Sequence, residues 1–196
     1  ASLAVVNNIS KLKKNSKKIK VKDTLKFLTK ISEIVRRNFS SKIIAITGSC
    51  GKTSLKELLK QTLNKFGKVT SSPKSFNNRY GVPLSLFNLN LKHDFGVFEV
   101  GMDKKGEINS LSKIIKPNIG IITNISYAHA KNFNNIKQIA LAKSELINNI
   151  ETNGFIVLNA DDKFFNLHKE IAKKKKLNIL SFGKSKKANV KFANIR

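Results

Sequence analysis

The sequence predicts an α/β fold in which helices wind around a mostly parallel, doubly wound sheet. From residue 42 onward, short apolar runs alternate with segments in which apolar residues recur at helical spacing, and this alternation is typical of such folds. The apolar runs are largely continuous, as expected of strands that are buried on both faces. Together these two observations predict a doubly wound α/β fold.

The individual elements follow from the same spacing. Residues 1–22 hold a short apolar piece and a lysine-rich linker, which is too little for a domain. A helix is expected to begin at Asp23-Thr24 and to use the apolar positions Leu25, Leu28, Ile31, Ile34 and Val35. Strands are expected over 42–47, 95–100, 118–123, 154–158 and 177–182. Helices are expected near 52–66, 107–115, 135–149 and 162–174.

Composition narrows the class of protein. The 196 residues can hold one domain and part of another. The formal net charge of +26 would suit a nucleic-acid partner. However, the lysines are spread along the whole chain, and no aromatic–basic interleaving of a base-stacking platform accompanies them. We therefore attribute the charge to a general Lys/Asn/Ile bias and expect no specific nucleic acid, keeping a basic nucleic-acid-binding module as an alternative.

The chain has a single cysteine, Cys50, so an internal disulfide is excluded, and a reducing cytoplasm is the expected location. No apolar run approaches the roughly 20 residues of a membrane span, and no signal-peptide pattern is present. We expect no membrane insertion. The chain begins with Ala1 rather than Met, which leaves processing or trimming open.

The most informative segment lies between the first expected strand and the first expected helix behind it. It reads Thr47-Gly48-Ser49-Cys50-Gly51-Lys52-Thr53-Ser54. In such a turn the backbone N–H groups and the positive end of the helix dipole face an anion. The lysine reaches the terminal phosphates of a nucleotide and the hydroxyl helps to hold Mg²⁺. We expect ATP to bind here.

This motif is a shorter variant of the Walker A loop, because Ile46 occupies the place of its first glycine. The alternative is a strand–turn–helix whose glycines serve only the turn. The placement of Lys52 and Thr53 directly behind Gly51 favours the phosphate-binding interpretation.

Other candidates lie where later strands end, because ligands of doubly wound sheets bind at the carboxyl ends of the strands. Glu99 ends one such strand and could supply the carboxylate that Mg²⁺ takes beside phosphate oxygens. His129 follows the next strand, and Lys143 lies on the helix behind it. A structural histidine and an ordinary surface lysine remain the alternatives for these two residues.

Two polar segments leave the choice between binding and folding open. Asn77-Asn78 could offer amide donors to phosphates or make a tight turn before a helix-like segment. Asn159-Ala160-Asp161-Asp162 follows a further strand and would cap a helix at least as readily as it would bind a ligand.

Taken together, these segments resemble the central ATP-binding domain of the Mur ligases, which are ATP-dependent amide-forming enzymes of peptidoglycan synthesis. The resemblance covers about residues 23–190. It is carried by Thr47-Gly48-Ser49-Cys50-Gly51-Lys52-Thr53, Asn77-Asn78-x-x-Gly81-Val82-Pro83, Glu99-Val100-Gly101-Met102 with Gly106-Glu107-Ile108, Thr123-Asn124-Ile125 with Ala128-His129, Ala142-Lys143-Ser144-Glu145 and Asn159-Ala160-Asp161-Asp162. The paired asparagines and the Gly-Met…Gly-Glu-Ile stretch are most similar to the MurF-type branch, in which Asn usually stands where this chain has Cys50.

The resemblance implies roles that spacing alone does not give. Lys52 would act with the loop amides on the ATP phosphates. Thr53 and Glu99 would hold one Mg²⁺, and His129 would help to hold a second together with a carbamate on Lys143. The implied phosphate-binding positions are Thr47, Gly48, Ser49, Cys50, Gly51, Lys52, Thr53, Ser54 and Asn78, and the implied catalytic residues are Lys52, His129 and Lys143.

The branch that the chain resembles adds D-alanyl-D-alanine to UDP-N-acetylmuramoyl-tripeptide through an acyl phosphate. Against that pattern, we expect residues 1–22 to be a remnant of the N-terminal UDP-sugar-binding domain with its linker. We expect residues 23–196 to be the central domain without its C-terminal part, and the C-terminal ligase domain to be absent. Such a fragment is expected to be inactive alone. Another Mur-type or folylpolyglutamate synthase-like ligase is the alternative within the superfamily.

Overall fold

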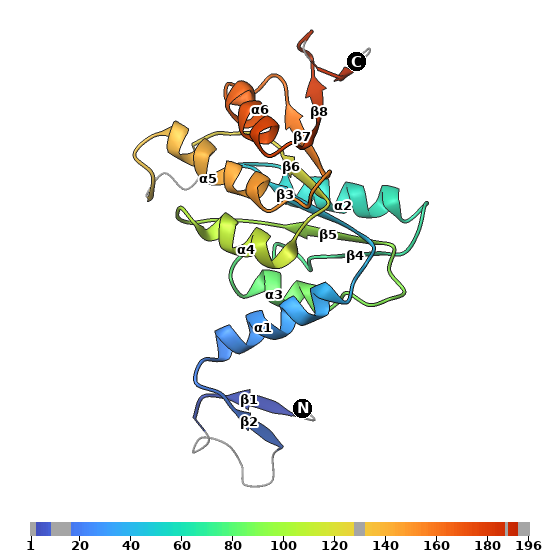
Figure 1. Cartoon of the computed structure of the whole chain (residues 1–196), viewed down its shortest axis with the longest axis vertical. Helices are drawn as coiled ribbons and strands as arrows, with labels where there is room; N and C mark the ends of the chain where they lie inside the picture. Colours follow the sequence, from blue (N-terminus) through green and yellow to red (C-terminus); the bar gives the residue numbers. More distant parts are fainter. Residues whose placement is uncertain (1–2, 9–16, 128–131, 187, 192–196) are drawn as a thin grey trace.

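A computed structural model describes residues 3–8, 17–127, 132–186 and 188–191, and its elements are labelled in Figure 1. The helices are α1 (Thr24–Arg37), α2 (Lys52–Leu63), α3 (Gly81–Leu86), α4 (Glu107–Ile115), α5 (Ile136–Asn148) and α6 (Phe165–Lys174). The strands are β1 (Ala4–Val6), β2 (Lys18–Lys20), β3 (Lys42–Thr47), β4 (Val69–Ser71), β5 (Phe95–Glu99), β6 (Ile119–Ile122), β7 (Phe155–Asn159), β8 (Asn178–Gly183) and β9 (Val190–Lys191). No helix among these residues is long and apolar enough to cross a membrane.

One parallel sheet dominates the structure. Within the described ranges it has seven strands in the order β4-β5-β3-β6-β7-β8-β9. The first strand in the chain to enter the sheet, β3, therefore lies between β5 and β6. Register places Ile46 opposite Glu99 and Thr47 opposite Ile122, so these three strands end at one edge. The predicted parallel α/β sheet is confirmed.

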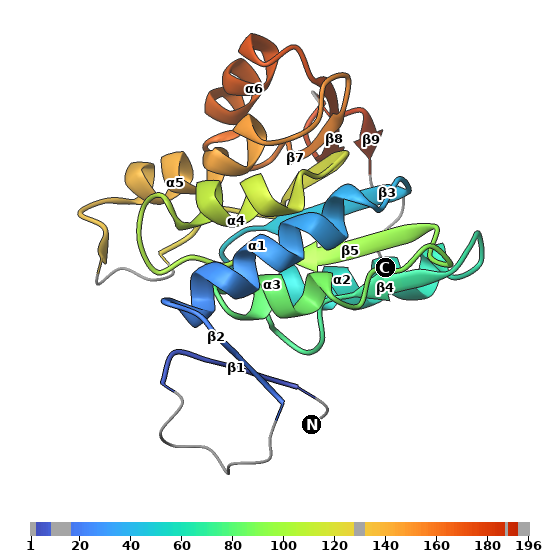
Figure 2. The same ribbon diagram turned by 60° about the horizontal axis from the view of Figure 1, so that its bottom comes forward.

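Helices cover the two faces of this sheet unequally (Figures 1 and 2). One face carries α1, α3, α4, α5 and α6, whose apolar side chains form two core clusters with the strands. The other carries α2, whose Leu55, Leu59 and Leu63 pack on Ile44, Ile46 and Val97. The β1–β2 pair is separate from the sheet and lies beyond α1 in both views.

The expected strands and helices match the observed ones to within a few residues at their ends. The helix expected at Asp23-Thr24 begins there, and the Asp23 carboxylate accepts hydrogen bonds from the N–H groups of Leu25 and Lys26. Four short strands, β1, β2, β4 and β9, were not predicted. These strands have only two or three residues each, so they offer no apolar run long enough to indicate a strand.

A buried arginine joins α1 to the end of α4. Arg36 is 8% exposed and donates from Nε to the Ile115 carbonyl, from one terminal nitrogen to Phe39 O at 2.8 Å, and from the other to Lys116 O at 2.6 Å. Burial lowers the pKa of the guanidinium, and the charge of Glu151 partly opposes that shift. Arg36 thus satisfies carbonyls that the C-terminus of α4 leaves without helical partners.

Replacing Arg36 should therefore destabilise the domain. We expect Arg36→Met to lower the free energy of unfolding by about 3 kcal/mol, because several buried carbonyls would lose their donor. Urea denaturation followed by circular dichroism measures the change. Arg37→Met is the matched control, because Arg37 is exposed and its loss should cost no more than about 0.5 kcal/mol. Equal stability of the two variants would contradict the assigned role of Arg36.

Candidate functional site

The candidate site lies at the carboxyl edge of the sheet, where β3, β5 and β6 end side by side. The turn between β3 and α2 carries the glycine-rich motif. Gly51 is the N-cap of α2 and adopts a left-handed conformation with φ of 78°, which glycine tolerates because it lacks a Cβ. The first hydrogen bond of α2 runs from Leu55 N–H to Gly51 O. The N–H groups before Leu55 therefore point beyond the N-terminus of the helix.

Gly48 permits a close approach between this turn and the end of β6. Its φ is 149°, and a Cβ built on it would lie 1.8 Å from Thr123 Oγ1. Thr123 Oγ1 donates to the Cys50 carbonyl at 2.7 Å. Only glycine therefore fits at position 48 while this contact persists.

Further hydrogen bonds hold the turn on the loop that follows β6. The N–H of Ser49 donates to Asn124 O at 3.0 Å, and the N–H of Cys50 donates to Asn124 Oδ1 at 3.0 Å. Ser49 Oγ donates to Ser126 O and accepts from Ser126 N–H. Since the Ser49 and Cys50 amides are engaged in this way, the backbone donors that could meet an anion here are the first N–H groups of α2.

The lysine of the motif lies over the turn. Lys52 is half-buried, and its Nζ donates to Gly48 O at 2.9 Å and to Ser49 O at 3.5 Å. Its ammonium therefore lies beside the first turn of α2 and adds to the positive potential there.

A buried carboxylate faces the same helix from β5. Glu99 is 1% exposed. Its Oε2 accepts from Thr53 Oγ1 at 2.8 Å, and its Oε1 accepts from Asn77 Nδ2 at 2.7 Å. Among the residues that the structure describes, no lysine or arginine forms an ion pair with Glu99. Each carboxylate oxygen can accept more than one bond, so Glu99 retains capacity for a cation.

Lys143 reaches the turn from α5, on the opposite face of the sheet. It is 1% exposed and donates from Nζ to Gly48 O at 3.0 Å, the carbonyl that also accepts from Lys52. Burial and, to a lesser degree, the nearby charge of Lys52 lower the pKa of the Lys143 amine to about 7, and Cys50 opposes this shift. The alternative of an ordinary surface lysine is therefore excluded.

The environment of Lys143 is fixed by the contact between α5 and α4. The Glu145 carboxylate accepts from Gly106 N–H at 2.8 Å and from Asn109 N–H at 3.0 Å. Glu145 lies on α5 two residues beyond Lys143 and thus satisfies N–H donors at the N-terminus of α4. This contact fixes the position of α5 relative to α4.

The other candidate residues have different surroundings or lie outside the described part of the chain. His129 lies outside the described residues. Thr47 is buried, and its Oγ1 is the buried side-chain atom that lacks a hydrogen-bond partner among the residues described. Asn78 Oδ1 accepts from the N–H groups of Tyr80 and Gly81, so this oxygen makes the turn that begins α3. Asp162 accepts from Ile125 N–H at 2.7 Å and supports the loop after β6.

Two features of the site were not predicted: the direct contact of Asn77 with Glu99 and the role of Asn124 in holding the turn. Their positions after β4 and β6 were the available signals, but β4 was not identified. In the described part of the chain, no three His, Cys, Asp or Glu side chains cluster in a way that could hold a metal ion. Of the four predicted metal ligands, Thr53, Glu99 and Lys143 are among the described residues and His129 is not.

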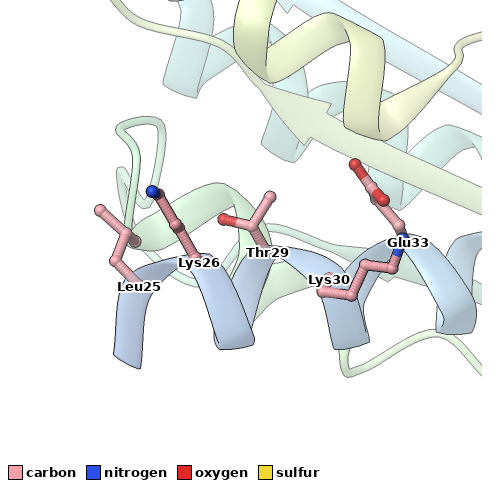
Figure 3. A pocket seen from close by; sticks show the side chains of 5 residues that line it. All are labelled: Leu25, Lys26, Thr29, Lys30 and Glu33. Carbon is pink, nitrogen blue, oxygen red and sulfur yellow. The ribbon is translucent and has the colours of Figure 1, made fainter. Parts of the chain in front are cut away.

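Two surface hollows lie away from this edge. One, of about 470 Å³, is shallow and is formed along a single face of α1 (Figure 3) by Leu25, Lys26, Thr29, Lys30 and Glu33. The other, of about 460 Å³, lies toward the amino ends of β3 and β6 and is lined by Glu33, Arg36, Arg37, Lys113, Ile114, Lys116 and Glu151. Neither contains a predicted site residue.

Comparison with known proteins identifies the family. Residues 46–196 match the Mur ligase middle domain. The chain belongs to the Mur ligase family. It is 38% identical to the UDP-N-acetylmuramoyl-tripeptide–D-alanyl-D-alanine ligase of Rickettsia prowazekii, over 97% of this chain and 43% of that ligase. It is also 38% identical to the ligase of the same name from Buchnera aphidicola strain APS, over 90% of this chain and 39% of the relative.

Solved structures agree with the sequence match. A MurF crystal structure from Acinetobacter baumannii superimposes with a TM-score of 0.88 and 32% identity, over 97% of this chain and 40% of that one. MurF from Thermotoga maritima, solved in complex with ADP, gives 0.81 and 30%, over 94% of this chain and 42% of that one. Helicobacter pylori folylpolyglutamate synthetase gives 0.60 at 16% identity and shares the fold. This Mur ligase chain spans about two fifths of the length of its MurF relatives.

The close approach at Gly48 yields a prediction about the turn. Gly48→Ala should destabilise the domain more than Gly51→Ala does. A Cβ at position 51 meets nothing within 4 Å, so that variant carries only backbone strain, on the order of 1 kcal/mol. Thermal unfolding of the two variants measures the difference. Adding Thr123→Ala to Gly48→Ala should restore part of the loss; a Gly48→Ala chain as stable as Gly51→Ala would contradict the geometry.

Proposed function

We propose that this chain is the ATP-phosphate and Mg²⁺-binding part of a ligase that joins D-alanyl-D-alanine to UDP-N-acetylmuramoyl-tripeptide. The observation that carries the proposal is the convergence, at one sheet edge, of the free N-terminus of α2, Lys52 and the hydrogen bond from Thr53 to the buried Glu99 carboxylate. The names of the MurF relatives support the substrates. The ADP complex of the Thermotoga maritima enzyme supports the nucleotide.

The residues at this edge fit a nucleotide with its metal. The N–H groups at the start of α2 and the Lys52 ammonium would hold phosphate oxygens. The Thr53 hydroxyl and the Glu99 carboxylate are the hard oxygen ligands that Mg²⁺ takes beside phosphates. Bound ATP would supply the phosphoryl group that activates the peptide carboxylate as an acyl phosphate, leaving ADP. The dipeptide amine would then displace inorganic phosphate and lose a proton to form the amide.

We further propose that Lys143 carries a carbamate and, together with His129, holds a second Mg²⁺. The carbamate would form when the neutral Lys143 amine attacks CO₂ and releases one proton. Two observations support it: Nζ is buried against Gly48 O beside the turn, and burial brings its pKa to about 7, so much of the amine is neutral at physiological pH. A carbamate offers anionic oxygens where an ammonium would repel the metal.

We place the protein in the cytoplasm, since Cys50 is a free thiol and a reducing compartment keeps such thiols unpaired. We do not propose a nucleic-acid function, because the residues that converge at the sheet edge suit phosphates and a metal. Tight, salt-sensitive DNA binding that survives Lys52→Met would favour that alternative.

Nucleotide binding tests the site itself. We expect the chain to bind ATP in the presence of Mg²⁺ and Lys52→Met to weaken this binding at least about tenfold, since charge-assisted hydrogen bonds to phosphate are lost. Glu99→Gln should weaken only the Mg²⁺-dependent part. Titration calorimetry with ATP, with and without Mg²⁺, measures both effects. Lys65→Met removes an exposed lysine just beyond α2 and should bind as the unaltered chain does; equal binding by Lys52→Met and Lys65→Met would overturn the assignment.

A substrate panel tests the ligase branch. The protein made from the complete reading frame that encodes this chain should release phosphate from ATP only when UDP-N-acetylmuramoyl-tripeptide and D-alanyl-D-alanine are both present. Single free amino acids in place of the dipeptide, or a folate with glutamate, should not replace them. Turnover with a folate and glutamate would instead place the protein in the folylpolyglutamate synthase-like branch.

A further inference from the structure

A second lysine of α2, one turn beyond the phosphate-binding motif, is fully buried. Lys56 is 0% exposed. Its Nζ donates to Ser72 O at 2.8 Å and to Lys74 O, and it lies 3.1 Å from Glu57 Oε1. Burying an ammonium costs free energy unless other groups replace its water, and here the backbone carbonyls of another segment do so.

That segment is the β4–α3 loop, residues 72–80. Its first residue is tied to β5, because Ser72 N–H donates to Val97 O at 3.1 Å and Ser72 Oγ accepts from Glu99 N–H at 3.0 Å. Lys74 adopts a left-handed conformation with φ of 48°, which is unfavourable for a residue other than glycine. The Lys56 ammonium binds the carbonyls on both sides of Pro73 and so holds the loop through this turn.

The same loop delivers Asn77 to Glu99. Asn77 Nδ2 donates to Glu99 Oε1 at 2.7 Å, and Asn77 O accepts from Gly101 N–H at 2.8 Å. The other carboxylate oxygen accepts from Thr53 on α2. The two oxygens of Glu99 are thus oriented by two different elements, α2 and the β4–α3 loop, and Lys56 links these elements to each other.

We propose that Lys56 is a positioning residue for the carboxylate of Glu99. By fixing the β4–α3 loop to α2, it sets the distance between Asn77 and Thr53 and thereby the orientation in which Glu99 meets a cation. Lys56 acts through Ser72 and Asn77. The inference rests on the proposed function, because it concerns the Mg²⁺ that Glu99 would hold.

The test compares Lys56→Met with Lys60→Met. Methionine keeps most of the side-chain length and removes the ammonium, and Lys60 is a half-buried lysine one turn further along the same helix. ATP binding is measured across a Mg²⁺ titration and again in EDTA. We expect Lys56→Met to raise the Mg²⁺ concentration for half-maximal ATP binding about tenfold, because the loss of a residue that orients a metal ligand typically weakens metal binding by about that factor or more. The affinity for ATP in EDTA should stay within about twofold of that of the unaltered chain, because Lys56 is proposed to orient Glu99 and not to contact the phosphates.

A double-mutant cycle with Asn77→Ala identifies the route. If Lys56 acts through Asn77, the combined variant should need little more Mg²⁺ than Asn77→Ala alone, because interactions in one chain of contacts are not additive. If the increases in Mg²⁺ requirement caused by the two single substitutions instead multiply in the combined variant, Lys56 does not act through Asn77 and the inference is overturned.

The outcomes separate the two proposals. Failure of the unaltered chain to bind ATP with Mg²⁺ would remove the proposed function and, with it, the basis of the inference. If the unaltered chain binds but Lys56→Met has the Mg²⁺ dependence of Lys60→Met, the inference alone is overturned. An equal loss of ATP affinity in Lys56→Met with and without Mg²⁺ would also overturn the inference, since that would indicate general damage to the fold. Should Lys56→Met not fold, Lys56→Gln carries the same test; failure of both to fold would make Lys56 a purely structural cation and end the inference.

Discussion

The buried charge of Glu99 is the constraint around which the carboxyl edge is organised. A carboxylate removed from water loses several kcal/mol of hydration, and here two neutral donors, Thr53 and Asn77, replace only part of it. Because no cationic side chain in the described ranges pairs with it, the negative charge is available to an added cation. The position of the β4–α3 loop, the buried ammonium of Lys56 and the start of α2 all serve to hold this one group.

Charge is distributed unequally about the end of β3. Glu99 faces α2 on one side of the sheet, whereas Lys143 reaches the same turn from α5 on the other side. Both Lys52 and Lys143 donate to the carbonyl of Gly48, and their mutual repulsion helps to lower the pKa of the buried one. The turn therefore lies between a carboxylate and a weakly basic amine, an arrangement that suits the proposed metal–nucleotide complex.

Much of the fold and part of the site could be predicted from the sequence. The long apolar runs and amphipathic segments gave the central strands and helices, and the glycine-rich turn located the edge at which Lys52, Thr53 and Glu99 meet. The short strand β4 left no pattern, so the sequence did not reveal that Asn77 would reach Glu99. Nor does composition separate buried Lys56 and Lys143 from the many exposed lysines, because burial depends on how distant segments pack.

Paramagnetic relaxation tests most directly the claim that this edge binds a metal–nucleotide complex. In ¹H–¹⁵N spectra of the chain, Mn²⁺ added with ATP should broaden the backbone amide signals of Lys52, Thr53 and Glu99 at low ratios. It should leave those of Thr29 and Glu33, in the hollow of α1, unaffected. Broadening that begins in α1, or that spreads evenly over the lysine-rich surface, would contradict a site at the end of β3.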